Sequence, residues 1–265
     1  RSYSVTGVQT CALPICSAIN TQYFNVHGRI KLFGMYHGLG LSLLNDKIGF
    51  NKNLGMNLAY AYRTTAGSGD LGIGVNLGFM NSSLEKNKWV FPSGGTSDVA
   101  VPSKEAKAMT FDAGFGLFYN TDNLYMGLSV AHLMESQVNY PEGNMVLDRT
   151  FYLTAGYNYQ LMNPLFEIRP SVFVSSDIAS TQFSINGILM YNKRFWGGLG
   201  YRNIDAISVM AGIELISALE LGVAYDYTIS ALQKYSEGSV EIMLRYNFTF
   251  KVEKDNKTYK SIRYL

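Results

Sequence analysis

The stretches LGMNLAYAYR at residues 54–63 and LGIGVNLGFM at residues 71–80 decide the fold. In both, every second residue is large and apolar, and the residues between them are mostly small or polar. Successive side chains of a β-strand point to opposite faces of the sheet. The period of two therefore predicts two strands, each with one unbroken apolar face.

The alternation recurs in twelve segments and continues almost to the end of the chain. Most segments have about 9–11 residues, the length that a tilted strand needs to cross an outer membrane. No helical pattern separates them, so consecutive strands are expected to pair antiparallel. The expected strands are 36–44, 54–63, 71–80, 110–119, 124–132, 151–160, 166–176, 182–191, 194–202, 206–215, 219–228 and 239–250.

The composition favours lipid over water around these strands. Only 16% of the residues are charged, and the chain is rich in glycine (26) and tyrosine (19). A soluble antiparallel barrel or sandwich alternates too, but an apolar face as complete as that of 239–250 would promote aggregation on a soluble edge strand. The net charge of +2 gives no reason to expect a nucleic-acid partner. The sequence predicts an all-β fold, a transmembrane antiparallel β-barrel in the bacterial outer membrane.

The expected connections alternate in length. Bacterial barrels have short turns on the periplasmic side and longer loops outside, so this alternation predicts an orientation. Aromatic residues near the strand ends are expected to form the two interfacial girdles. The short connections are 64–70, 120–123, 161–165, 192–193 and 216–218; the interleaved set has long ones at 45–53, 81–109, 133–150 and 229–238 and short ones at 177–180 and 203–205. The aromatic residues are Tyr60, Tyr62, Tyr157, Tyr159, Tyr225, Tyr227, Phe248 and Phe250.

Residues 1–17 are expected to be foreign to the protein. The segment VTGVQTCALPI at 5–15 resembles the translation of a common sequencing adapter, and it lacks the basic start and apolar run of a signal peptide. Both cysteines, Cys11 and Cys16, lie in this leader, so no thiol chemistry is expected of the native protein. The expected domains are the leader 1–17, a barrel fragment 18–250 that lacks its first strands and signal peptide, and a polar, mildly basic tail 251–265.

The alternation of side chains between the two faces also places the charged residues of the strands on the inner face. A charge that faced lipid near the midplane would cost about 2–4 kcal/mol. Two interpretations are open: the charges line a selective pore, or they form a network of salt bridges that fills the barrel and holds its shape. The mixed signs, four positive and six negative, favour the network. The ten residues are Arg63, Asp112, Glu167, Arg169, Arg202, Glu214, Glu220, Asp226, Glu241 and Arg245.

Catalytic and metal-binding interpretations find little support. The carboxylates between 214 and 226 suit a structural role in the lumen, and no serine is marked out as a nucleophile. His27, His37 and His132 lack the spacing of metal ligands to each other or to a carboxylate. We therefore expect no enzyme activity, no cofactor and no metal site.

Several motifs follow one another in a characteristic order. The most specific is GLGLSLLNDKIG at 38–49; the others are RTFYLTAGY at 149–157, FWGGLGYR at 195–202, LGVAYDYT at 221–228 and GSVEIMLRYNF at 238–248. In these motifs the chain resembles the PorP/SprF family, outer-membrane proteins of the type IX secretion system of Bacteroidota. Val240 stands where the family usually has histidine. The resemblance also implies a signal peptide and an early strand pair, and so about fourteen strands in the intact protein.

The resemblance implies a role in the secretion or surface attachment of cargo proteins with C-terminal sorting domains, such as the adhesins of gliding species. A lumen of about fourteen strands is expected to be too narrow for folded cargo, which favours an accessory, cargo-docking barrel. Its expected partners are outer-membrane lipid, other secretion components and the cargo. The loops 81–109 and 133–150 are candidate contact surfaces, and the tail 251–265 either meets a periplasmic partner or is a disordered terminus. The alternatives are a passive channel or hydrophobic-solute transporter, and a purely structural barrel.

Overall fold

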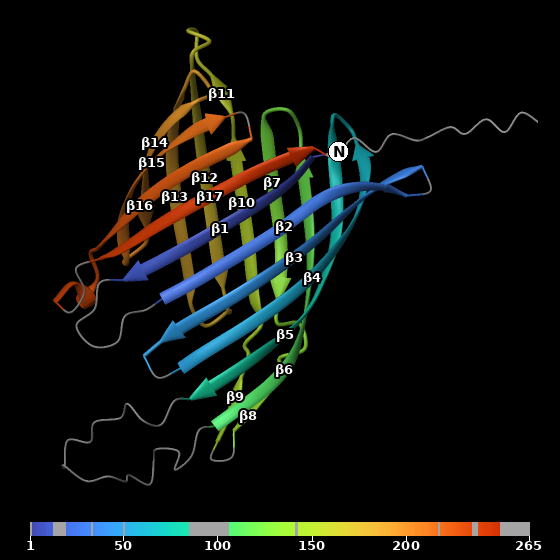
Figure 1. The fold of residues 1–265 in the computed structure, drawn as a ribbon, viewed down its shortest axis with the longest axis vertical. Helices are drawn as coiled ribbons and strands as arrows, with labels where there is room; N and C mark the ends of the chain where they lie inside the picture. The colour runs from blue at the N-terminus through green and yellow to red at the C-terminus, as the bar shows by residue number, and fades with distance from the viewer. Residues whose placement is uncertain are drawn as a thin grey trace, which may run out of the picture.

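The computed structural model describes residues 2–12, 20–32, 34–49, 51–84, 106–140, 143–216, 218–234 and 238–249. They form one antiparallel sheet that closes on itself into a barrel, and a small separate hairpin (Figure 1). The strands are β1 (Ser2–Ala12), β2 (Asn20–Leu32), β3 (Met35–Ile48), β4 (Asn51–Ala66), β5 (Gly69–Leu84), β6 (Ala106–Asn120), β7 (Leu124–Ala131), β8 (Gln137–Tyr140), β9 (Gly143–Val146), β10 (Thr150–Tyr157), β11 (Tyr159–Gln160), β12 (Phe166–Ser176), β13 (Thr181–Tyr191), β14 (Phe195–Arg202), β15 (Ala206–Ile216), β16 (Leu219–Thr228) and β17 (Ser239–Thr249).

The barrel has fourteen strands. β10 and β11 are interrupted only at Asn158 and both pair with β12, so they form one strand of the wall. Each strand of the barrel pairs with the barrel strands that precede and follow it in the sequence. The ring closes through β1, which pairs with both β17 and β2. Closure leaves the sheet without an open edge, which confirms the predicted all-β transmembrane barrel.

All twelve expected strands are present, six of them with longer bounds. The number fourteen, which we expected of the intact protein, is reached within this chain because β1 and β2 add two strands. The strand β2 was overlooked, although it alternates: Phe24, Val26 and Ile30 lie on the face opposite to His27 and Arg29. β2 lies within 18–250, and the division of the chain into a leader, a barrel fragment and a tail stays a prediction.

The first strand lies within the segment expected to be foreign. Ser2–Ala12 pairs over its whole length with β17 and also with β2. The ladder uses backbone N–H and C=O groups, which residues of almost any type supply. This pairing is therefore compatible with either origin of the segment, and the foreign origin of 1–17 stays a prediction. The tail 251–265 lies outside the described residues.

The outer face of the barrel is apolar. Directly paired residues share a face, and the pairing of Leu41 with Leu58 and of Leu58 with Leu77 carries the apolar face from β3 to β5. Leu58 and Leu77 are 56% and 64% exposed. Surface of this kind is stable against lipid, so the outer face is the membrane face. The described residues contain no helix that is long and apolar enough to cross a membrane.

The longest connections gather at one end of the barrel, here called the loop end. They are 132–149, which contains the hairpin of β8 and β9, and 229–238, which contains the 3-10 turn η2 (Ala231–Lys234). The segment 85–105, between β5 and β6 in the sequence, lies outside the described residues. The other end, the turn end, has short connections such as 67–68 between β4 and β5 and 121–123 between β6 and β7. Figure 1 shows β8 and β9 at the bottom and these two turns at the top.

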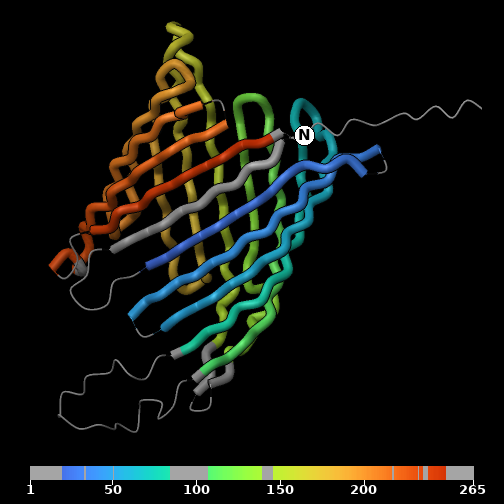
Figure 2. Tube along the Cα trace, in the orientation of Figure 1, coloured from blue at the N-terminus to red at the C-terminus, as the bar shows by residue number. Residues whose placement is uncertain are grey.

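One expected loop is wrong. The segment 45–53 was predicted as a long loop, but β3 and β4 continue to pair through it as far as Ile48 and Asn51. Outside the hydrocarbon core of the membrane, paired strands do not need an apolar outer face. Asn45, Asp46 and Lys47 therefore extend β3 instead of ending it. The tube in Figure 2 shows the long strands from β2 to β5 crossing obliquely in front of the rear wall, as expected of tilted barrel strands.

Candidate functional site in the lumen

The inner face carries the charged residues of the strands. Cross-strand register places all ten residues predicted for the lumen on this face; for example, Arg202 lies opposite Ser184 and Ala206, and Asp226 opposite Ser208 and Ser239. Eight of the ten lie within 4 Å of an oppositely charged group in the described part of the chain, counting His132 as a potential cation. They do so as separate clusters distributed around the wall.

One cluster near the loop end joins β14 and β16. The Arg202 guanidinium lies 3.2 Å from the carboxylate of Asp226 and 3.1 Å from that of Asp205, in the turn that follows β14. The Asp226 carboxylate is buried, whereas Arg202 and Asp205 are each 36% exposed. A buried carboxylate depends strongly on its cation, so this pair holds the ends of β14 and β16 together across β15.

A second cluster lies on the same wall, closer to the turn end. Glu220 accepts one hydrogen bond from the Arg245 guanidinium at 3.0 Å and another from the Trp196 indole N–H at 2.8 Å. The indole lies across Gly212 and Gly222, where a Cβ atom would meet the ring. These contacts connect β14, β16 and β17 from inside, and the missing side chains of the two glycines make room for the tryptophan.

The remaining predicted charges form smaller pairs or none. Glu214 lies directly opposite Glu220 in the ladder, and neither Glu214 nor Glu241 has an ion pair within the described residues. The role of the ten charges as one network stays a prediction. The smaller pairs are Arg169 with Glu167 at 2.7 Å, His132 with Asp112 at 2.9 Å and Arg63 with Asp70 at 3.6 Å.

The three histidines lie apart. His27 faces the lumen, and His132 follows the end of β7 beside Asp112. His37 lies on the outer face, where its Nδ1 is 2.8 Å from the hydroxyl of Tyr60 and its ring stacks on the Tyr60 ring. Among the residues that the structure describes, no group of three or more His, Cys, Asp or Glu side chains is placed to hold a metal ion.

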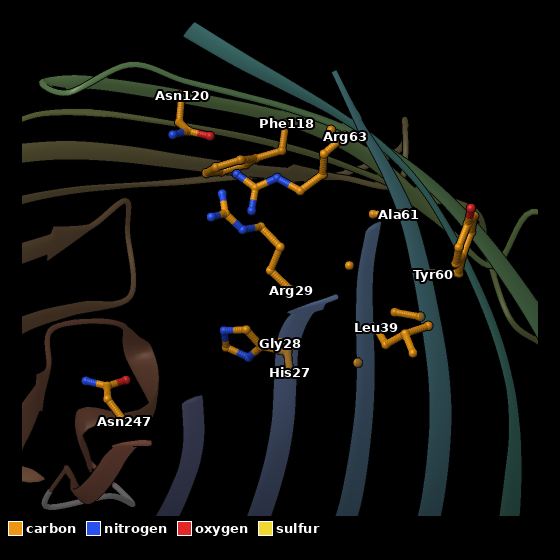
Figure 3. A pocket seen from close by; sticks show the side chains of 14 residues that line it. His27, Gly28, Arg29, Leu39, Tyr60, Ala61, Arg63, Phe118, Asn120 and Asn247 are labelled. Atoms are coloured by element: carbon orange, nitrogen blue, oxygen red, sulfur yellow. The ribbon is translucent and has the colours of Figure 1, made fainter. Parts of the chain in front are cut away.

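The sequence pattern did not identify the lumen residues of β2. His27 and Arg29 of β2 point into the same pocket as Arg63, Phe118 and other inner-face residues (Figure 3). The signal that could have found them is the alternation of β2, which puts these polar residues between outward apolar ones.

The hairpin of β8 and β9 covers part of the inner wall at the loop end. Val138 is only 1% exposed and packs with Ala108 and Leu147, while Met80 contacts the same cluster. By register, Ala108 and Met80 face inward. The hairpin therefore folds over the inner face of β5 and β6 instead of projecting freely from the mouth.

Hydrogen bonds fix the residues that lead into this hairpin to β6. The Ser136 hydroxyl donates to the Phe111 carbonyl at 2.7 Å, and the Leu133 N–H donates to the Ala113 carbonyl at 2.9 Å. β7 is shorter than β6, so the loop provides partners for the part of β6 that β7 does not reach. The described residues of 132–149 thus pack against the wall at the mouth of the barrel.

Solved structures with this architecture are outer-membrane barrels. Omp33 of Acinetobacter baumannii superposes with a TM-score of 0.56 at 6% identity, covering 94% of this chain and 98% of that one. The toluene transporter TbuX of Ralstonia pickettii gives 0.53 at 13% identity, covering 94% and 89%. At such low identity the likeness shows the fold alone. No curated protein sequence matches the chain.

The family comparison covers most of the chain. The profile described as "Type IX secretion system membrane protein PorP/SprF" matches residues 9–246, which extend from β1 into β17. This match confirms the resemblance drawn from the motifs, and the apolar outer face and the barrel neighbours agree with an outer-membrane location. The chain belongs to the PorP/SprF family of type IX secretion system membrane proteins and is an outer-membrane β-barrel.

Proposed function

We propose that this barrel is an accessory, cargo-docking component of type IX secretion, and that a different protein forms the pore for folded cargo. It would assist the secretion or surface attachment of proteins with C-terminal sorting domains, including adhesins of gliding Bacteroidota. The observation that supports this role best is the inner wall at the loop end, where the hairpin of β8 and β9 covers β5 and β6. Barrels of 16–18 strands leave an aqueous channel, and this one is smaller.

The charge clusters fit such a barrel as structural elements. Arg202 with Asp226 and Arg245 with Glu220 are close pairs that link different strands, as expected of side chains that hold the shape of the wall. Pores that select ions by side-chain charge typically use a ring of one sign. We propose that the ten charges maintain the shape of the barrel.

The docking surface would be the loop end. Its described residues include the hairpin of β8 and β9 and the turn η2, and bacterial barrels direct their longer loops outward. The loops 81–109 and 133–150 stay the candidate contact surfaces, and 85–105 lies outside the described residues. The tail 251–265 is the candidate contact for a periplasmic partner. Outer-membrane lipid would surround the apolar face.

Deletion of the gene in the bacterium that carries it tests this role. We expect cargo with C-terminal sorting domains to be lost from the cell surface and restored by a plasmid copy. Affinity purification of the tagged full-length protein in mild detergent should retain cargo or other secretion components. Normal surface cargo in the deletion strain would contradict the proposal and leave a purely structural barrel.

The second candidate is a passive channel or a transporter of hydrophobic solutes. It is favoured by a cavity of about 640 Å³ on the inner wall of β4–β7, β10 and β12. Phe173 stacks there on Tyr152, with 5.9 Å between ring centroids. TbuX, which is described as a toluene transporter, shares the architecture. Uptake of radiolabelled aromatic solutes by cells with and without the gene would separate this candidate from the first.

A further inference from the structure

A second cavity in the lumen, of about 600 Å³, lies near the turn end. Its floor consists of residues with little or no side chain: Gly38, Gly40, Ala59, Ala61 and Gly72. In the ladder, Gly38 lies between Arg29 on β2 and Ala61 on β4. This floor leaves space above β3 and β4 for long side chains from both sides.

Two arginines extend over this floor. Arg29 comes from β2 and Arg63 from β4, and Figure 3 shows both guanidinium groups reaching into the pocket beside Phe118. Arg29 lies over the ring of Tyr36, with 4.2 Å between its guanidinium carbon and the ring centroid. Lys31 approaches the same ring at 5.4 Å. Three cations therefore converge on one part of the inner wall.

Negative charge does not balance these cations. Within the described residues, the acid partner of the group is Asp70, which is 3.6 Å from Arg63 and 40% exposed. Arg29 has no carboxylate within ion-pair distance in that part of the chain. Elsewhere on the inner wall arginines have close acidic partners, as Arg169 has in Glu167 at 2.7 Å. Among the described residues, this pocket therefore carries an excess of positive charge.

We propose that Arg29 and Arg63 form a binding site for a small oxyanion of the phosphate class, either free phosphate or a phosphate ester. A planar guanidinium presents two parallel N–H donors that match two oxygens of such an anion, and two guanidiniums balance a dianion. His27 and Asn120 line the same pocket and offer additional donors. The site opens to the aqueous lumen, so water weakens each contact and we expect affinity in the high micromolar to millimolar range. The proposed anion site does not depend on the secretion role.

Titration calorimetry with inorganic phosphate tests the site on the full-length protein, folded in detergent at low salt. Arg29→Gln and Arg63→Gln should each weaken binding by about tenfold or more. Ala61→Leu retains both charges but fills the floor, so it should weaken binding as well. Arg194→Gln is the matched control, since Arg194 is an exposed arginine of the turn between β13 and β14 and should bind as the wild type does. Heat-modifiable gel mobility verifies that every variant is folded.

The source of the anion is distinguished by glycerol 3-phosphate. Tighter binding of this ester than of phosphate indicates a phosphorylated solute, and the reverse indicates free phosphate; either result supports the site. The proposal is wrong if the wild type binds neither at millimolar concentration. It is equally wrong if the double variant of Arg29 and Arg63 binds phosphate as tightly as the wild type does.

Discussion

At the level of single residues, the most constrained charge on the inner wall is Asp226. Its carboxylate is 10% exposed and faces Arg202, whose guanidinium also reaches Asp205. The pair joins residues 24 positions apart in the chain. Alternation predicted that both residues face inward, but periodicity gives no information on which inward residues become partners. That choice depends on the register and on the curvature of the closed wall.

Replacement of Asp226 by Asn removes the carboxylate and leaves Arg202 with Asp205 alone. When a fully buried ion pair loses one partner, the free energy of unfolding falls by about 3–5 kcal/mol. Arg202 is partly exposed, so we expect a smaller fall, of about 1–2 kcal/mol. Urea unfolding in detergent, followed by the fluorescence of Trp196 and Trp89, measures the change.

The matched control is Asp205→Asn, which removes the more exposed partner of the same arginine. This substitution should lower the free energy of unfolding by less than about 1 kcal/mol, because exposed ion pairs usually contribute little. Equal losses in the two variants would show that burial of Asp226 does not determine the strength of the pair.

At the level of the elements, a period of two was sufficient for the twelve expected strands because lipid enforces an apolar outer face at every second residue. The need for an apolar residue at every second position does not apply beyond the membrane surface. The strands β3 and β4 continue through the polar residues Asn45, Asp46 and Lys47, which resemble a loop in the sequence. The hairpin of β8 and β9 was also not predicted, since its place depends on contacts with Ala108 and Met80 far along the chain.

The membrane face of β4 allows a depth test. Leu58 lies on the outer face near the middle of the strand, and Leu54 lies on the same face closer to the loop end. An arginine facing lipid costs about 2–4 kcal/mol at the midplane and about 0–1 kcal/mol near the interface. Leu58→Arg should therefore lower the free energy of unfolding in lipid vesicles clearly more than Leu54→Arg. Equal effects, or none, would contradict the placement of β4 in the bilayer.

The hairpin of β8 and β9 should undock without unfolding the barrel. Val138→Asp places a charge in the fully buried contact with Ala108 and Leu147, and no cation of that cluster is present to pair with it. We expect rapid proteolysis within 132–149 while the barrel keeps its heat-modifiable gel mobility. Loss of the folded barrel would show instead that the hairpin is part of its stability core. Val138→Ile is the control and should remain protected.

At the level of the whole molecule, the account depends on a closed ring of fourteen strands whose loop-end mouth is partly covered. Alternation and loop order predicted the barrel, and the motifs predicted the family. They do not predict how the ring closes, because β1 lies in the segment that resembles a sequencing adapter and β2 has a short, polar-rich alternation. The number of strands sets the width of the lumen, and the width separates an accessory barrel from a wide pore.

Single-channel recording of the full-length protein in planar bilayers tests this central claim most directly. We predict no large, steady currents from the wild type. Deletion of 137–146 should raise the conductance, because it removes the hairpin that covers β5 and β6. Large and stable openings of the wild type, unchanged by the deletion, would contradict the accessory role and favour a passive channel.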